Sequence, residues 1–148
     1  MSALSFHIRP ATVEDVDTLL ILVRELLRQN LFASHPIGHV LLVVSDKPGD
    51  EGTMIGYMAY YFTFSTWTGK PGLALLDLFI REGYRGQGIG RAVFGELGKI
   101  AREMNCGTIT WVAKQWNTPA VAFYKKMGAE EVMGHIQLKI DGNGIRGL

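Results

Sequence analysis

The sequence has little cysteine, little net charge and no long hydrophobic run, and each shortage narrows the possible functions. Cys106 is the single cysteine of 148 residues, so an internal disulfide is excluded and a reducing compartment, the cytoplasm, is expected. No apolar run approaches the roughly 18 residues that span a membrane, and residues 1–17 carry no signal peptide. A net charge of +1 without a basic cluster gives no electrostatic footprint for nucleic acid. We expect an intracellular protein with neither a membrane nor a nucleic-acid partner.

Metal ligands at the usual spacing are also scarce. His35 and His39 stand without cysteine or carboxylate neighbours at ligand spacing, so no metal site is expected. With 148 residues, 47% of them hydrophobic, the chain is long enough for one domain with a proper core and too short for two. We expect a single domain over residues 5–140 and a short tail over residues 141–148.

Hydrophobic periodicity predicts an α/β protein. Apolar residues recur at helical spacing between Val13 and Gln29, so one face of a helix there is expected to be buried. The polar turn Asp46–Gly52 separates two apolar stretches and predicts an antiparallel hairpin, while residues 65–72 are expected to connect the next two strands. The expected strands are residues 5–9, 39–45, 54–64, 73–80, 108–113 and 132–140, and the expected helices are residues 13–29, 89–105 and 118–127.

One stretch has the layout of a phosphate-binding site. The apolar strand Leu73–Ile80 is followed by a glycine-rich turn, Arg85–Gly90, and then by the first turn of an amphipathic helix. Glycines let the backbone approach an anion closely, and the free N–H groups at the start of a helix attract it. A purely structural turn between a strand and a helix is the alternative.

Two common nucleotide-binding motifs are excluded by what this stretch lacks. No lysine follows Gly90, so the loop of nucleoside-triphosphate-binding proteins does not fit. Arg91 stands where a dinucleotide-binding fingerprint requires its third glycine, and residues 108–114 contain no carboxylate where that fold needs one. The turn therefore belongs to neither class.

Two motifs together resemble a different family. Residues 84–90, Tyr-Arg-Gly-Gln-Gly-Ile-Gly, resemble the pyrophosphate loop of the GCN5-related N-acetyltransferases (GNAT), and residues 117–129 resemble their N-x-x-A-x-x-F-Y-x-x-x-G-A signature. The resemblance runs from Phe6 to about Ile140 and is closest to the spermidine/spermine and thialysine N-acetyltransferases. It implies a central, mostly antiparallel sheet of six to seven strands flanked by about four helices. It also implies acetyl-CoA as donor, a small-molecule amine as acceptor, and a homodimer.

The same resemblance implies which residues bind the acetyl donor. The main chain of Leu78, Phe79 and Ile80 is expected to pair with the pantetheine amides and to bind the oxyanion, while their side chains lie in the core. The residues expected to contact the pyrophosphate of the donor are Arg85, Gly86, Gln87, Gly88, Ile89, Gly90 and Arg91. The other expected contacts with the donor are Asn117, Ala120, Phe123 and Tyr124.

Two side chains are expected to carry the chemistry. A lysine-like amine has a pKa near ~10.4, so it must lose a proton before it attacks the thioester. The expected proton acceptor is Asp77, through ordered water or directly, because Leu76 stands where the family carries a glutamate that faces the amine. A carboxylate that only holds a nearby loop is the alternative for Asp77. Tyr124 is expected to donate a hydrogen bond to the departing thiolate, since full proton transfer from a phenol would be uphill by about 2 kcal/mol.

The expected function is transfer of an acetyl group from acetyl-CoA directly to a primary amine of a polyamine, diamine or lysine-like molecule. Cys106 lies at the far end of a predicted helix from the glycine-rich motif, so a covalent enzyme intermediate is not expected. Acetylation of a protein or peptide amine is one alternative. A non-catalytic acyl-CoA-binding module is another, and Leu76 is the residue that motivates it.

Overall fold

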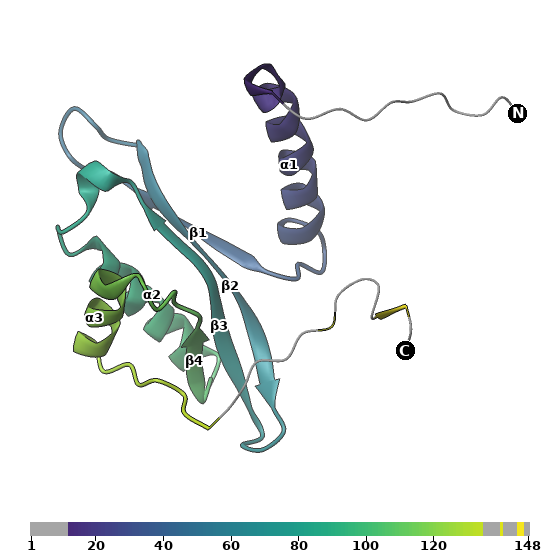
Figure 1. Ribbon diagram of the computed structural model, residues 1–148, viewed down its shortest axis with the longest axis vertical. Helices are drawn as coiled ribbons and strands as arrows, with labels where there is room; N and C mark the ends of the chain where they lie inside the picture. The colour runs from purple at the N-terminus through teal and green to yellow at the C-terminus, as the bar shows by residue number, and fades with distance from the viewer. Residues whose placement is uncertain (1–11, 135–139, 141–144, 147–148) are drawn as a thin grey trace, which may run out of the picture. The chain divides into compact units, whose positions relative to one another are not determined.

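The computed structural model describes residues 12–134, 140 and 145–146 and divides into two compact units, Met1–Val112 and Ala113–Leu148 (Figure 1). The single domain over residues 5–140 and its tail remain predictions. The first unit contains a 3-10 turn (Val13–Asp15), α1 (Val16–Leu31), β1 (His39–Val44), β2 (Met54–Ser65), β3 (Lys70–Ile80), a second 3-10 turn (Glu82–Tyr84), α2 (Ile89–Glu103) and β4 (Thr108–Trp111). The second unit contains α3 (Thr118–Lys126).

The strands form a four-stranded sheet within the described residues, in the order β1-β2-β3-β4. β1 pairs with β2 and β2 with β3 in the antiparallel sense, whereas β4 pairs parallel with β3. The expected α/β class with a mostly antiparallel sheet is confirmed, although the described part contains four strands rather than six to seven and three α-helices rather than about four. The predicted strand 5–9 lies outside the described residues. Of the predicted strand 132–140, residues 132–134 and 140 are irregular and the rest lies outside them.

The hairpin between β2 and β3 is tighter than the sequence indicated. Ser65 pairs with Lys70 and Phe64 with Pro71, so residues 70–72 belong to β3 rather than to a connector. The predicted connector is wrong here because proline and glycine favour turns in general, whereas a proline is tolerated near the start of a strand. Gly69 adopts a φ of 65° in the turn, a conformation that glycine reaches without strain.

A β-bulge interrupts β3 at Leu76. The register between β2 and β3 shifts between Ala59 and Tyr60, which leaves Leu76 without a partner on β2. A bulge moves the alternation of side chains by one residue, so the core face continues from odd to even positions. The residues of β3 that belong to the core cluster or pack against it are Leu73, Leu75, Leu78 and Ile80. Leu76 itself is 62% exposed.

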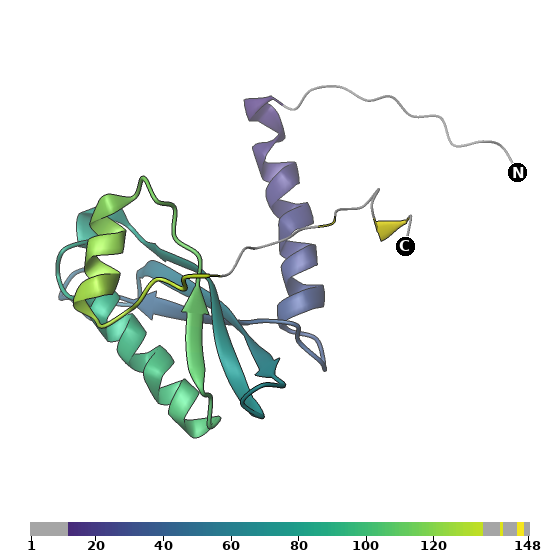
Figure 2. The ribbon, with the colours of Figure 1, turned by 60° about the horizontal axis from the view of Figure 1, so that its bottom comes forward.

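The core lies between the sheet and α2, which covers one face of the sheet (Figures 1 and 2). Val93, Leu97 and Ala101 recur at every fourth position of α2 and are buried, so one face of this helix meets the strands. The predicted helix 89–105 is confirmed with a slightly earlier end. Asn105 follows that end with a φ of 53°, a left-handed conformation common just after a helix.

We expect Leu97→Ala to lower the free energy of unfolding by about 2–5 kcal/mol, because the removed side chain leaves a cavity in a close-packed core. Leu97 has no exposed surface. Urea denaturation followed by circular dichroism measures the change. Leu42→Ala on β1 is the matched control, since that side chain is 59% exposed and should cost less than about 1 kcal/mol. Equal losses for the two variants would contradict this placement of the core.

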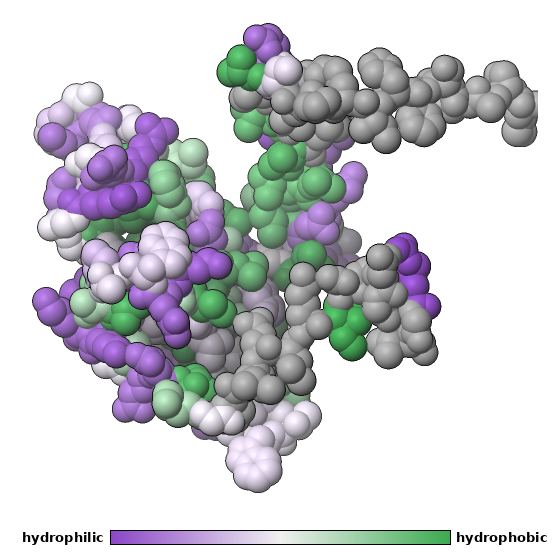
Figure 3. All heavy atoms as spheres, in the orientation of Figure 1, coloured by the Kyte–Doolittle hydropathy of each residue, from purple (hydrophilic) through white to green (hydrophobic). Residues whose placement is uncertain are grey.

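The apolar face of α1 is more exposed than its sequence pattern predicted (Figure 3). The predicted helix 13–29 is confirmed apart from its first turn, which is 3-10. However, Leu20, Val23 and Leu26 are each about half exposed. The prediction of a buried face is therefore wrong for these residues, because no strand of the described part of the chain packs closely against them.

The second unit is organised around α3. Pro119 occupies its first turn, where a missing N–H costs no helical hydrogen bond. At the other end, Gly128 adopts a φ of 92°. The N–H of Ala129 donates to the carbonyl of Tyr124 at 3.1 Å, and that of Gly128 donates to the carbonyl of Lys125 at 3.0 Å. This pair of bonds is a Schellman motif, which confirms the predicted end of the helix at Gly128.

Candidate functional site

Within the described residues, no strand pairs with the second half of β3 on the side that faces β4. β4 pairs with β3 only from Gly72 to Leu75. Beyond Leu75, the described residues place no strand on that side, although β2 accompanies β3 on the other side as far as Ile80. A free strand edge can pair with the amides of an extended ligand, as an added strand would. The main chain of residues 78–80, which the resemblance assigns to pantetheine, lies on this free stretch.

The side chains of these three residues do not all lie in the core. Ile80 is buried, and Leu78 packs against the core cluster. Phe79 is 44% exposed and lies on the opposite face, where its ring centroid is 6.0 Å from that of Tyr57. The expectation that Phe79 is a core residue is wrong, because the bulge at Leu76 decides which side chains face α2.

The glycine-rich turn is open and has free donors. Gly86 and Gly88 adopt φ angles of 74° and 83°, in the left-handed region. Among the described residues, no other part of the chain comes within 4 Å of the place where a Cβ would stand on either glycine. No backbone carbonyl in residues 12–134 accepts a hydrogen bond from the N–H groups of Gly86–Arg91, and α2 begins at Ile89. Free N–H groups at the start of a helix form a site that suits phosphate.

Side chains of the turn tie it to the end of β3. Nε of Arg85 donates to the carbonyl of Ile80 at 2.8 Å, and Nε2 of Gln87 donates to the carbonyl of Gly83 at 3.2 Å. Arg91 is exposed on the first turn of α2. The bond to Ile80 gives Arg85 a structural role beside the phosphate contact that the resemblance implies. That contact, like those of Gln87 and Arg91, stays a prediction.

A hydrogen bond that the sequence did not reveal joins the β1–β2 hairpin to this turn. The hydroxyl of Tyr84 donates to the carboxylate of Asp50. This bond is the main cause that lowers the pKa of Asp50 below its ordinary value of 3.8, and a hydrogen bond with Thr53 adds to the effect. The two residues are 34 positions apart, so no local sequence signal could have paired them.

We expect Tyr84→Phe to weaken the folded protein at neutral pH more than in acid. A carboxylate whose pKa is lowered on folding contributes stability above its unfolded value, near 3.8, and that contribution is lost as the pH falls through the folded value. Urea midpoints measured from about pH 6 to about pH 3 should therefore converge for the wild type and the variant. A gap that stays constant over this range would contradict the assignment, because the other carboxylates are the same in both proteins.

Asp77 lies on the sheet face opposite to α2 and is exposed. The hydroxyl of Tyr57 donates to Oδ2 of Asp77. This hydrogen bond is the main cause that raises the pKa of Tyr57, and burial of the phenol adds to it. Tyr57 is not among the residues that the sequence predicts for the site. Its signal was present in the alternation of β2, but only the register of the bulged pair places it beside Asp77.

The second unit carries the four residues of the other motif. Asn117 directly precedes α3 without making a side-chain capping bond, and its N–H donates to the carbonyl of Lys114 at 2.9 Å. Ala120, Phe123 and Tyr124 are partly buried, and the two aromatic rings lie 5.6 Å apart. Burial raises the pKa of Tyr124 above its ordinary value. The roles of these residues toward an acetyl donor stay predictions.

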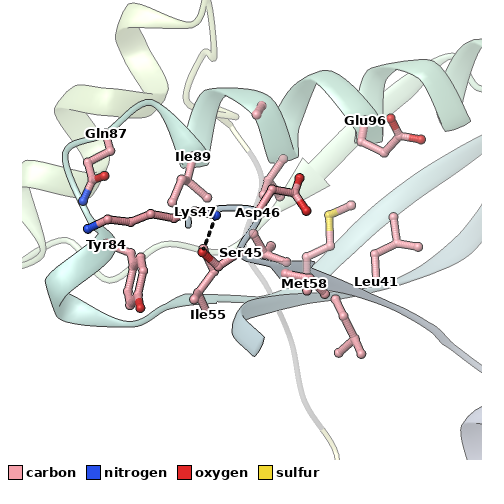
Figure 4. Close-up of a pocket in the computed structure, with 15 residues that line it drawn as sticks. Leu41, Ser45, Asp46, Lys47, Ile55, Met58, Tyr84, Gln87, Ile89 and Glu96 are labelled. Carbon is pink, nitrogen blue, oxygen red and sulfur yellow. Dashed lines mark hydrogen bonds between the residues drawn. The ribbon is translucent and has the colours of Figure 1, made fainter. Parts of the chain in front are cut away.

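A cavity of about 490 Å³ lies beside the glycine-rich turn, over β1 and the start of α2 (Figure 4). Its lining is mainly apolar, and the side chain of Lys47 extends toward Gln87 at its polar end. Its walls come from β1, the following turn, β2, the glycine-rich turn and α2. The cavity therefore lies on the β1 side of the sheet and is distinct from the free edge of β3, which faces β4.

The expected absences of a metal, a membrane partner and a nucleic-acid partner apply to the whole chain, of which the structure describes a part. In the described part of the chain, no three His, Cys, Asp or Glu side chains form a group that could hold a metal ion. No helix there combines the length and apolar character needed to cross a membrane. The expectations of no metal, no membrane and no nucleic-acid partner stay predictions.

Comparison with known sequences identifies relatives over most of the chain. The sequence model of the acetyltransferase (GNAT) family matches residues 9–129. A thialysine N-epsilon-acetyltransferase from Sus scrofa is 32% identical, with 97% of each chain covered. A spermidine/spermine N(1)-acetyltransferase-like protein 1 from Homo sapiens is 30% identical over 84% of this chain and 20% of its own length.

Comparison with solved structures gives the same fold. An integron cassette protein from the mobile metagenome of V. cholerae superposes with a TM-score of 0.70 and 26% sequence identity. The match covers 84% of this chain and 75% of that protein. Because it extends over most of both chains, the match supports the α/β arrangement described above.

Proposed function

The chain belongs to the acetyltransferase (GNAT) family, and we propose that it transfers an acetyl group from acetyl-CoA directly to a primary amine of a small diamine or lysine-like molecule. As a member of this family it is an acetyl-CoA-dependent N-acetyltransferase. The observation that carries the proposal is the free edge of β3, which ends at an open glycine-rich turn and bears Asp77 on its exposed face.

The first unit supplies groups that suit the donor. The unpaired N–H groups of Gly86–Arg91 and the start of α2 would hold the pyrophosphate, and the absence of a Cβ at Gly86 and Gly88 allows close approach. The main chain of residues 78–80 would pair with the pantetheine amides. N–H groups on that edge would also bind the negative charge that develops on the acyl oxygen.

Asp77 would remove the proton that the acceptor must lose. A protonated amine is attracted by an exposed carboxylate, and its proton passes to Asp77 through ordered water. The neutral nitrogen then attacks the thioester carbon and the new C–N bond forms. The nitrogen loses its second proton to solvent, and the C–S bond breaks. Tyr124 would donate a hydrogen bond to the sulfur that leaves as thiolate. Because burial raises its pKa, the phenol stays protonated at neutral pH and stabilises the anion without giving up its proton.

The acceptor class is supported by the relatives and by the charge at the site. The Sus scrofa relative is named for thialysine, a lysine-like amine, and an L-ornithine N5-acetyltransferase from Arabidopsis thaliana is 26% identical over 70% of this chain. Both names describe small molecules with more than one ionisable amine. An exposed carboxylate such as Asp77 would attract such cations.

Release of free CoA thiol from acetyl-CoA tests this proposal. The purified protein is assayed with polyamines, lysine and thialysine, amino sugars and short peptides as separate acceptors. We expect release with diamines or lysine-like amines. Release with peptides alone would replace the small-molecule acceptor by a protein one. Binding of acetyl-CoA by calorimetry, without release on any acceptor, would contradict small-molecule transfer altogether.

We also propose that the protein acts as a homodimer in the cytoplasm. Both proposals rest on the sequence: the dimer on the resemblance to diamine acetyltransferases, and the compartment on the single Cys106. Sedimentation equilibrium of the purified chain tests the first, and fractionation of the source cells tests the second.

A further inference from the structure

We propose that Tyr57 is a positioning residue of the acceptor site, whose hydroxyl holds one carboxylate oxygen of Asp77 so that the other oxygen faces the acceptor amine. The inference rests on the proposed function, because it assigns Asp77 to the acceptor. It adds to the site a residue that lies outside both the glycine-rich turn and the motif of residues 117–129.

The register of the bulged strand pair brings the two side chains together. Tyr57 pairs with Phe79 and Ala59 pairs with Asp77, so Tyr57 and Asp77 are diagonal neighbours on one face of the sheet. The hydroxyl of Tyr57 donates to Oδ2 of Asp77. Without the bulge at Leu76, Asp77 would continue the alternation of Leu75 and point into the core.

The ring of Tyr57 packs against another aromatic ring, and its hydroxyl acts as a hydrogen-bond donor. It lies against Phe79, with ring centroids 6.0 Å apart and planes inclined by 32°. The hydrogen bond to Asp77 and burial both raise the pKa of Tyr57, so its hydroxyl stays protonated at and well above neutral pH. A phenol hydroxyl has one proton with which to donate a hydrogen bond, and here it donates that bond to the carboxylate of Asp77.

Asp77 is left with one oxygen for the acceptor. Within the described residues, its Oδ1 accepts no hydrogen bond, and the side chain is exposed. A hydrogen bond at one oxygen restricts the rotation of the carboxylate, so it favours one orientation of an ammonium group at the other oxygen. A charged primary amine, rather than a neutral nucleophile, is the acceptor that this arrangement recognises.

Tyr57→Phe tests the role because it removes only the hydroxyl. We expect kcat/KM for the amine to fall about tenfold, mainly through KM, since a hydrogen bond to a charged group is lost. The KM for acetyl-CoA should not change. Tyr61→Phe on the same strand and face is the matched control: it pairs with Ala74, its hydroxyl donates to no carboxylate of the described residues, and it should stay within about twofold of the wild type.

A double-mutant cycle with Asp77→Asn separates positioning from packing. If Tyr57 acts through Asp77, adding Tyr57→Phe to Asp77→Asn has no further effect on kcat/KM. Equal effects of Tyr57→Phe in both backgrounds would overturn the proposal. So would an unchanged kcat/KM in Tyr57→Phe. If the wild type acetylates no amine at all, the proposed function fails instead, and the two failures are thereby distinguished.

A spectroscopic measurement keeps the proposal testable if Tyr57→Phe does not fold. The hydrogen bond to Asp77 is the main cause that raises the pKa of Tyr57, and burial adds to it. Alkaline titration of tyrosine absorbance in Asp77→Asn should therefore show one phenol shifted toward its ordinary pKa of 10.0, relative to the wild type. Identical titration curves would show that the two side chains do not interact in solution.

Discussion

Replacing Tyr124 with Phe should lower kcat about a hundredfold while the affinity for acetyl-CoA changes by less than about threefold. The hydroxyl is proposed to contact the sulfur only as it becomes a thiolate, so its loss affects the transition state and not the bound donor. Single-turnover kinetics with the best acceptor gives the rate of the chemical step. Isothermal titration with acetyl-CoA gives the affinity.

Tyr60→Phe is the matched control for this variant. Burial also raises the pKa of Tyr60, but that side chain lies in the sheet core, 7% exposed. Its loss of one hydroxyl should leave kcat within about threefold of the wild type. A Tyr124→Phe enzyme with the kcat of the wild type would remove Tyr124 from the mechanism. A loss of acetyl-CoA affinity equal to the loss of kcat would instead make it a binding residue.

The pH dependence of kcat gives a second test of the role of Tyr124. A phenol with a raised pKa remains a donor to higher pH than an ordinary tyrosine. The activity of the wild type should therefore show no decline from Tyr124 below about pH 10. An alkaline loss of kcat near neutral pH, absent from Tyr124→Phe, would contradict a hydrogen-bonding role for the neutral phenol.

The glycine-rich turn was predictable because its signal is local. Gly86 and Gly88 precede a helix with a clear apolar face, and both adopt left-handed φ angles that glycine reaches without strain. The order of the elements in the described residues was predictable for the same reason. Each rests on periodicity within one segment, and the hairpin of β1 and β2 needed only its polar turn.

The exposed face of β3 was not predictable, because it depends on contacts between segments. The bulge at Leu76 exists only in the pairing of β3 with β2, and it reverses the inward and outward positions beyond it. The sequence alone therefore predicts Phe79 in the core and does not reveal the hydrogen bond between Tyr57 and Asp77. In the sequence, Leu76 stands where the family that the chain resembles carries a glutamate. In the structure, the bulge at Leu76 turns the side chain of Asp77 to the exposed face of the sheet.

The exposure of the apolar face of α1 was not predictable for a similar reason. Periodicity shows that a helix has an apolar face, but it does not show which element covers that face. The strand predicted at residues 5–9, one candidate for such packing, lies outside the described residues. Burial of Leu97 was easier to foresee, since α2 directly follows β3 and returns over the sheet that β3 belongs to.

Gly88→Asp should abolish most of the affinity for acetyl-CoA, whereas Gly88→Asn should retain much of it. Gly88 precedes α2 with a φ of 83°, and a side chain there would extend into open space in front of the helix. Asn and Asp have the same shape and both tolerate left-handed backbone, so the strain is nearly equal in the two variants. Their difference is one negative charge placed where the phosphates are proposed to bind.

The expected size of this difference follows from Coulomb's law. A carboxylate about 6 Å from one phosphate charge, at an effective dielectric constant of about 20, costs about 2–3 kcal/mol. The dissociation constant of Gly88→Asp, measured by isothermal titration, should therefore be about 30–150-fold weaker than that of Gly88→Asn. The gap should narrow in high salt, because the charges are near solvent. Equal constants for the two variants would place the phosphates elsewhere, and the N–H groups of Gly86–Arg91 would then serve the turn rather than the donor.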